Sequence, residues 1–405
     1  MVFVSLLENL EMSSLTTYLK STLFFLVIVF VSCQSKTNRE KNEFSEVENY
    51  EIDLKSKNIN SLNDILSFEK FVFLETIPEA LIHSISRLCI TDNDELIVFD
   101  ERSQKIILFS NEGKFIRTIA KKGNGPHELN IASDISYDNS KDYIYVLTQG
   151  KSIKIFNSKG EFVKRIKIDI YGTSIANFEN LLLVHNIAEY DNMKHSLAVL
   201  DLDGEIKEKY LLLPEKKSNF NYQNRNNFVK TNSGVRYLTS FDYSIYSYSS
   251  QGLKTKYCFD FLSNSAPPNY VSTLNTQKEF NVFKESLNYV HSITTFLEMG
   301  DWIYLEVIFN HRTYSIYINT KTKEIKKYMH KNLHDLFVQV ALRNIHGDRF
   351  ISAFYPYFIR SEVNYKFRLD YAKGKIDESI INEFKKIIAM KVDENPVVIF
   401  SKPKF

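Results

Sequence analysis

The sequence predicts an all-β fold, a six-bladed β-propeller built from four-stranded blades. Three observations predict it. A hairpin motif recurs about every 45 residues, its strands alternate apolar and polar residues, and a further strand pair precedes each hairpin. Alternation with a period of two indicates β-strands. Four strands per unit at this spacing are typical of propeller blades.

The repeated hairpin has a tight turn that ends in glycine, at Gly113, Gly160, Gly204 and Gly252. Successive glycines lie 47, 44 and 48 residues apart. Glycine readily adopts the positive φ that such a turn requires. A fifth copy, "YSIYINTKTKEIKKYM", has Lys323 at this place, 71 residues after Gly252. The excess length falls in residues 266–294, for which we expect a helical insertion.

The sixth blade is expected to combine both ends of the chain. Residues 339–358 supply two strands, and the C-terminal "NPVVIFSKPKF" supplies a third. The fourth is predicted at 68–77, because a blade shared by both ends closes the ring and leaves no free sheet edge. Between these strands, an apolar face at helical spacing predicts a helix near 377–391, with Asp377 available as N-cap. Seven blades are the alternative.

The N-terminus carries export signals. The apolar run "LFFLVIVFV" follows Lys20 and is about half the roughly 20 residues that span a bilayer, so it has the length of a signal-peptide core. The following "FVSC" resembles the lipobox of bacterial lipoproteins, which implies a lipid on Cys33. We therefore expect a signal peptide at 1–32 with a true start at Met12, a flexible tether at 33–49 and the propeller at 50–405. An uncleaved anchor and an ordinary signal peptide are the alternatives.

Several longer segments extend this resemblance to the propeller itself: "VFLETIPEALI", "NEGKFIRTIAKKGNGPHEL", "NSKGEFVKRIKI" and "DENPVVIF". With them the chain resembles the six-bladed β-propeller lipoproteins of Bacteroidetes, which are related to NHL-repeat propellers. That family commonly shows a Gly-x-Gly-Pro-Gly-Glu loop. This chain matches the loop at Gly123, Gly125, Pro126 and Glu128 but has His127 in place of the last glycine. The resemblance implies fold and export, and says little about activity.

Composition limits the classes of partner. A formal charge of +2 in 405 residues argues against nucleic-acid binding, which needs a concentrated basic face. Besides Cys33, the chain has Cys89 and Cys258, both in apolar strand-like runs, so we expect buried free thiols. Sequence spacing alone supplies no reason to pair them in a disulfide.

The glycine-rich stretch "KKGNGPHEL" is the first candidate site. It is predicted to cross from the last strand of one blade to the first strand of the next. No helix follows its glycines, which excludes the dinucleotide-binding and P-loop interpretations. Its glycines are expected to permit the backbone angles of the crossing. Such crossings end near the mouth of a propeller, so Lys122, Asn124, His127 and Glu128 are candidate ligand contacts.

Aromatic residues form the second candidate set. Tyr243, Trp302 and Tyr355 stand in aromatic-rich strands of successive blades, where polar-tipped rings suit glycans or peptides. Packing between blades is the competing explanation for them. His330 and His334 have helical spacing without a third ligand, so no metal site and no cofactor are predicted.

The sequence therefore favours a membrane-tethered, monomeric binding module of the cell envelope. Its expected partners are the membrane, through the lipid on Cys33, and a peptide, a glycan or an envelope protein. The alternative is an extracytoplasmic hydrolase or lyase that acts on a sugar or peptide in the central channel. Fold alone does not decide between them. We expect an anchor in the outer membrane, at its periplasmic face or at the cell surface.

Overall fold

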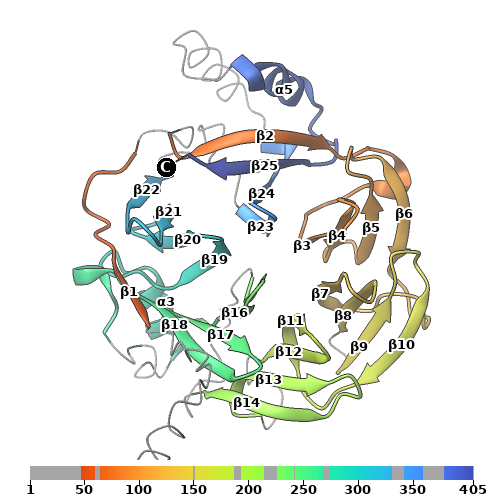
Figure 1. The fold of residues 1–405 in the computed structure, drawn as a ribbon, viewed down its shortest axis with the longest axis horizontal. Helices are drawn as coiled ribbons and strands as arrows, with labels where there is room; N and C mark the ends of the chain where they lie inside the picture. The colour runs from red at the N-terminus through yellow and green to blue at the C-terminus, as the bar shows by residue number, and fades with distance from the viewer. Residues whose placement is uncertain are drawn as a thin grey trace, which may run out of the picture. The chain divides into compact units, whose positions relative to one another are not determined.

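The structure is a computed structural model that describes residues 47–59, 64–148, 151–186, 193–213, 226–240, 242–267, 270, 274, 276–330, 342–358 and 378–404. The expected signal peptide and all but the last residues of the expected tether lie outside these ranges. Residues 47–405 form one compact unit, in which six sheets surround a common centre (Figure 1). The predicted six-bladed, all-β propeller is confirmed.

Four blades consist of consecutive antiparallel strands that run from the centre of the ring outward. Blade 1 contains β3 (Arg87–Ile90), β4 (Leu96–Asp100), β5 (Lys105–Phe109) and β6 (Phe115–Ala120), and blade 2 contains β7 (Ala132–Asp138), β8 (Tyr143–Thr148), β9 (Ser152–Phe156) and β10 (Phe162–Lys167). Blade 3 contains β11 (Gly172–Phe178), β12 (Leu181–Asn186), β13 (His195–Asp201) and β14 (Ile206–Leu212), and blade 5 contains β19 (Ile293–Met299), β20 (Trp302–Phe309), β21 (Arg312–Asn319) and β22 (Ile325–Met329).

Blades 4 and 6 recruit strands from the N-terminal part of the chain. Blade 4 contains β15 (Phe228–Thr231), β16 (Gly234–Leu238), β17 (Ser244–Ser249) and β18 (Gly252–Asp260), with β1 (Glu48–Glu51) added in parallel outside β18. Blade 6 contains β23 (Leu342–His346), β24 (Arg349–Phe354), β25 (Val397–Pro403) and β2 (Leu66–Phe73). The predicted sharing of one blade by both ends is therefore confirmed.

The closure of blade 6 is reinforced by Asn395. Its side-chain Nδ2 donates to the carbonyls of Glu75 and Ala80, both at 2.8 Å, and its Oδ1 accepts from the Ile82 amide at 2.9 Å. Asn395 is 1% exposed, so each of these bonds is shielded from competing water. The segment that follows β2 is thereby fixed to the segment that precedes β25.

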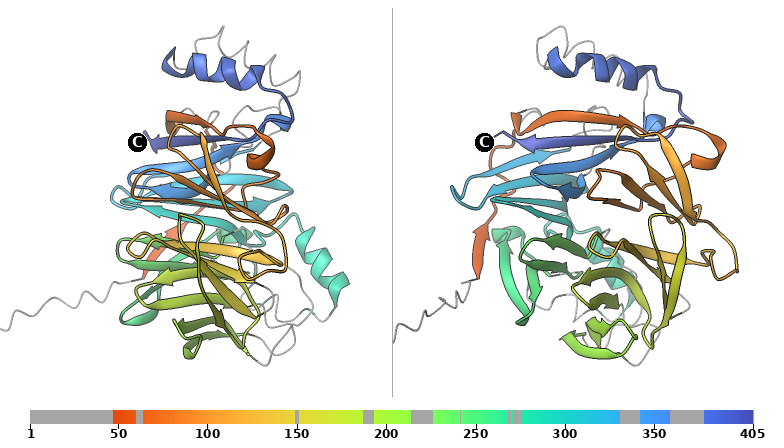
Figure 2. Two further views of the ribbon diagram at one scale, coloured as in Figure 1. Left: turned by 90° about the vertical axis from the view of Figure 1, so that its right-hand side faces the viewer. Right: turned by 45° about the vertical axis from the view of Figure 1, so that its right-hand side comes forward.

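In the described part of the chain, two α-helices lie outside the sheets, where the sequence predicted them. Within the expected insertion, α3 (Gln277–Lys284) begins with a capping box between Thr276 and Glu279. Near the C-terminus, α5 (Glu378–Ala389) lies along the outside of blade 6 (Figure 2), where Phe384 contacts Phe71 of β2 edge-on, at 5.6 Å between ring centroids. Asp377, the expected N-cap, lies outside the described residues. The described residues also include the 3₁₀ helices η2 (Pro78–Ala80), η3 (Leu262–Asn264) and η4 (Pro356–Phe358).

Two of the turn glycines have a second role besides their positive φ. Gly113 and Gly204 have φ of 86° and 91°, and a Cβ on either would lie 2.2 Å from a carbonyl oxygen of the preceding blade's outer strand. The turn of blade 5 meets β1 instead, where Lys323, with φ of 60°, donates from Nζ to Glu48 at 2.8 Å and to the Tyr50 hydroxyl at 3.1 Å. Lysine therefore replaces glycine at the turn that holds the N-terminal strand.

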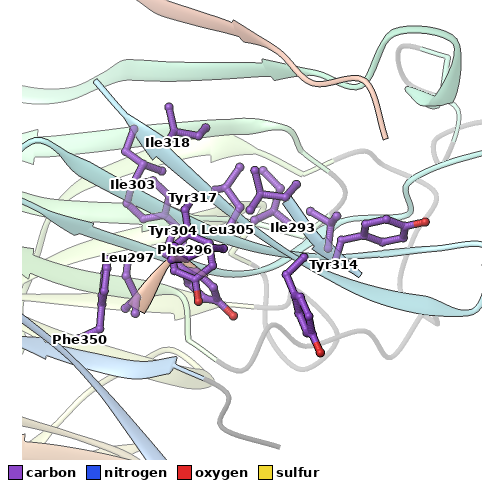
Figure 3. Packing of buried hydrophobic residues seen from close by; sticks show 14 of the residues in the cluster. Ile293, Phe296, Leu297, Ile303, Tyr304, Leu305, Tyr314, Tyr317, Ile318 and Phe350 are labelled. Carbon is purple, nitrogen blue, oxygen red and sulfur yellow. The ribbon is translucent and has the colours of Figure 1, made fainter. Parts of the chain in front are cut away.

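The core lies between the blades. The largest cluster fills the space around blade 5, where aliphatic and aromatic side chains of β19, β20 and β21 pack together with Phe350 of β24 (Figure 3). Because both faces of a middle strand are covered by neighbouring blades, strands such as β4, β8 and β20 read as nearly continuous apolar runs. In the described part of the chain, no helix is long and apolar enough to cross a membrane.

Candidate functional site

The crossing loop, residues 121–130, connects β6 at the outside of blade 1 to β7 at the inside of blade 2, as the sequence predicted. It folds on itself: the Glu128 carboxylate accepts a hydrogen bond from the Gly125 amide at 2.9 Å. Lys154 of β9 also supports the loop, because its ammonium donates to the carbonyls of Gly125 at 3.1 Å and Glu128 at 2.6 Å. Glu128 therefore organises the loop from within.

The loop glycines serve a purpose other than the one expected. Neither Gly123 nor Gly125 has a positive φ, so unusual backbone angles do not explain them. A Cβ on Gly123 would lie 1.9 Å from Oε2 of Glu128, and one on Gly125 would lie 3.2 Å from the same atom. A side chain at Gly123 would have to displace the flexible Glu128 carboxylate, so glycine at this position preserves the hydrogen bond between Glu128 and the Gly125 amide.

Gly123→Ala is therefore expected to displace the Glu128 carboxylate and destabilise the protein by about 1–2 kcal/mol, the cost of one partly buried charge-assisted hydrogen bond. Urea unfolding of Gly123→Ala, Glu128→Ala and the double variant measures this. Because both changes remove the same bond, the double variant should lose little more than either single variant. Fully additive losses would show that glycine serves another purpose here.

The other candidates of the crossing loop remain at the surface. Lys122 and His127 are exposed, and the His127 ring contacts Phe162 of β10 edge-on, with 5.3 Å between centroids. The Asn124 side chain accepts a hydrogen bond from Asn130 at 3.0 Å. The loop thus presents a cation, an amide and an aromatic pair on a fixed backbone.

The three aromatic candidates are not brought together. The Tyr243 hydroxyl donates to the carbonyl of Val290 and accepts from the Ala266 amide, at 3.0 Å for the latter, so it fixes the base of the insertion. Trp302 packs against the large cluster around blade 5. Tyr355 is 6% exposed and its hydroxyl accepts from the Ile85 amide at 2.8 Å. These contacts place the three side chains in packing between and beside the blades.

A polar network that the sequence analysis did not single out links the inner strands of blades 1 to 4. Arg87 of β3 forms a bidentate ion pair with Asp134 of β7, at 2.8 and 2.7 Å, and also bonds to the Asn226 side chain, which precedes β15. The same Asp134 accepts from the Ile175 amide of β11 at 2.9 Å. One carboxylate therefore connects three blades.

A second level of the network surrounds Lys230 of β15. Its ammonium donates to the carbonyl of Tyr137 at 2.8 Å and to the Asn177 side chain at 3.0 Å. The Ser136 hydroxyl of β7 accepts a hydrogen bond from the backbone amide of Asn177 at 3.1 Å. Lys230 retains solvent exposure, yet the surrounding protein lowers the pKa of its ammonium by desolvation. It therefore lies where blades enclose it while water still reaches it.

This network has a structural purpose that follows from the fold. The inner edge of each sheet would leave amides and carbonyls unpaired, which is costly where water is excluded. Side chains of neighbouring blades satisfy these groups and thereby connect the blades. The sequence signal was the polar alternation Asp134, Ser136 and Asp138 in "ASDISYD", at period two in the first strand of a blade.

Of the remaining reactive residues, Cys89 of β3 lies near Arg87, Asp134 and Lys230 of the network. Cys89 and Cys258 are both free and half-buried, and burial raises the pKa of the Cys89 thiol to about 11. The His330 Nε2 lies 2.8 Å from the Ser315 hydroxyl, and His334 is outside the described residues. Among the residues that the structure describes, no group of three or more His, Cys, Asp or Glu could hold a metal ion.

The fold and the central network define the protein as a closed six-bladed β-propeller. The chain belongs to the family described as Domain of unknown function (DUF4934), whose model matches residues 49–402. No curated protein matches the sequence.

Two crystal structures from Bacteroides are similar in fold. The first is a protein of Bacteroides fragilis NCTC 9343 with the description "Putative exported protein", with 18% sequence identity and a TM-score of 0.73, covering 89% of this chain and 100% of that one. The second is a member of the DUF4221 family from Bacteroides vulgatus, with 14% identity and a TM-score of 0.56, covering 85% of this chain and 99% of that one. At these identities the likeness concerns the fold.

Proposed function

We propose that the protein is an extracytoplasmic lipoprotein, anchored through Cys33, whose propeller is a ligand- or protein-binding module of the cell envelope. The binding role rests on a difference between the charged residues at the centre of the ring and those of the crossing loop. The charges at the centre, Arg87, Asp134 and Lys230, are engaged in bonds that connect blades. The crossing loop instead exposes Lys122 and His127 on this rigid scaffold, an arrangement that suits recognition.

Export is supported by two independent features, and anchoring by the first of them. The N-terminal "LFFLVIVFVSC" has the length and order of a signal-peptide core followed by a lipid-accepting cysteine. In addition, the Bacteroides fragilis protein described as exported shares this fold over its whole length. We infer that the propeller works outside the cytoplasm, at the outer membrane.

Cys33→Ser is expected to move the protein from the membrane fraction to the soluble fraction, because it removes the acceptor of the lipid. Fractionation of cells that express either form, followed by immunoblotting, measures the change. Cys258→Ser, which alters a cysteine of the folded propeller, is the matched control and should stay with the membranes. A Cys33→Ser protein that remains in the membrane fraction would rule out the lipid anchor.

The binding role is tested separately with the full chain purified in detergent. Incubated with glycans and peptides released from envelope preparations, it should retain a defined ligand that mass spectrometry recovers unchanged. Steady release of products that hydrolysis or a lyase reaction has cleaved would instead identify the protein as an enzyme.

A further inference from the structure

The surface around the crossing loop is basic and carries an aromatic pair. We define the basic loop surface by six residues whose positions are connected in the structure: Lys121, Lys122, Asn124, His127, Phe162 and Arg165. The His127 ring contacts Phe162 of β10. Arg165 of the same strand lies opposite Lys154 of β9, whose ammonium supports the loop from below. Of the six residues that define the surface, all are exposed except Phe162, which is half-buried.

Positive charge is concentrated in this part of the chain. Residues 114–167 contain 11 Lys and Arg but five Asp and Glu, a formal charge of +6, whereas the whole chain carries +2. Three of the five carboxylates are engaged inside the structure: Asp134 pairs with Arg87, Asp138 lies 3.4 Å from Lys141, and Glu128 accepts from the Gly125 amide. Two of the cations are paired as well, Lys114 with Glu75 and Lys141 with Asp138. Within the basic loop surface itself, Lys121, Lys122 and Arg165 are cations and none of the six residues is a carboxylate.

The pair formed by Lys154 and Arg165 adds an energetic argument. Two like charges directly opposite each other on neighbouring strands destabilise a sheet. Their repulsion contributes to a lowered pKa of the Lys154 ammonium, after the larger effect of burial. The Glu128 carboxylate of the loop offsets part of this repulsion at Lys154. An anion bound at the exposed Arg165 would relieve the remainder, which favours a negatively charged ligand.

We propose that the basic loop surface binds an acidic polysaccharide. Carboxylates repeated along a sugar chain match several separate cations, and the His127–Phe162 pair offers an apolar surface to a sugar ring. The inference rests on the proposed binding role and names its ligand class.

The test uses polygalacturonate as the acidic polymer, neutral dextran as the uncharged polymer, and the full chain in detergent. Binding to polygalacturonate should be saturable and weaken as salt rises. The double variant Lys122→Glu/Arg165→Glu should bind at least tenfold more weakly. Lys254→Glu/Lys256→Glu changes the net charge equally on β18 of blade 4 and should stay within twofold of wild type. Circular dichroism confirms that each variant is folded, and Lys122→Gln/Arg165→Gln replaces the first if it is not.

Each other outcome overturns the proposal. Equal weakening by the blade 4 control would show diffuse attraction to net charge, and equal binding to dextran would show that charge is irrelevant. Binding to phosphatidylglycerol vesicles through Lys122 and Arg165, without binding to polygalacturonate, would assign the surface to a membrane. Absence of any polymer binding would reject this ligand class. The envelope-ligand recovery also samples neutral glycans and peptides, so a ligand of another class recovered there would keep the proposed binding role while this proposal fails, and the Cys33→Ser fractionation tests the anchor alone.

Discussion

Replacing Glu298 by alanine is expected to destabilise the propeller by about 3–5 kcal/mol, because it leaves a buried guanidinium without its counter-charge. Arg236 of β16 has a side chain 1% exposed, and Glu298 of β19 is 11% exposed. Two hydrogen bonds, at 2.6 and 2.7 Å, join them across blades 4 and 5. Ser247 and Ser233 also accept from Arg236, at 2.7 and 2.9 Å, but neither carries charge.

Urea unfolding followed by circular dichroism measures this loss. Glu324→Ala is the matched control, because its ion pair with Lys326 is 3.5 Å long and Glu324 is half exposed; exposed pairs contribute about 0–1 kcal/mol. A second variant, Arg236→Met/Glu298→Leu, removes both charges and should recover most of the stability. If Glu298→Ala cost no more than Glu324→Ala, the pair would not be a main connection between blades 4 and 5.

The architecture could be predicted because its causes are local or periodic. The turn glycines repeat at a nearly constant interval, and the alternation of "FEKFVFLETI" and "NPVVIFSKPKF" identified the two strands that close blade 6. Even the exception at Lys323 was visible in the sequence. The reason for the lysine could not be predicted, because β1 pairs with β18 from about 200 residues away. The four residues "ENYE" contain no pattern that indicates a parallel partner strand.

The site was harder to predict because its contacts join residues far apart in the chain. Lys122, Asn124 and His127 could be selected as one contiguous loop, and the structure leaves them at the surface. Arg87 meets Asp134 and Asn226 only because inner strands converge at the centre of the ring. Tyr243 and Tyr355 were selected for their chemistry, whereas their hydroxyls bond to backbone groups, which composition does not reveal.

The second large effect is expected from pH. His185 of β12 is 3% exposed, its Nδ1 lies 2.7 Å from the Tyr237 hydroxyl, and its Nε2 has no hydrogen-bond partner among the described residues. Burial lowers the pKa of this imidazole to about 4 from 6.5. Between these values the unfolded chain binds a proton that the folded protein does not, so stability falls as the pH is lowered from 6.5 to 4. The loss amounts to about 3 kcal/mol over the window.

His185→Leu removes the titrating group, so its stability should cross that of the wild type as pH changes. At pH 7, where the wild-type imidazole is neutral, the variant should be equally stable or weaker by about 1 kcal/mol, since it loses the contact with Tyr237. At pH 4.5 it should be the more stable protein, because no buried imidazole resists protonation. Urea unfolding at both values decides this, with His83→Leu as control, since the His83 side chain is 60% exposed. If the free energies of unfolding of His185→Leu and wild type changed in parallel with pH, the acid sensitivity would come from groups other than His185. A buried neutral histidine must contribute to acid sensitivity wherever burial lowers its pKa.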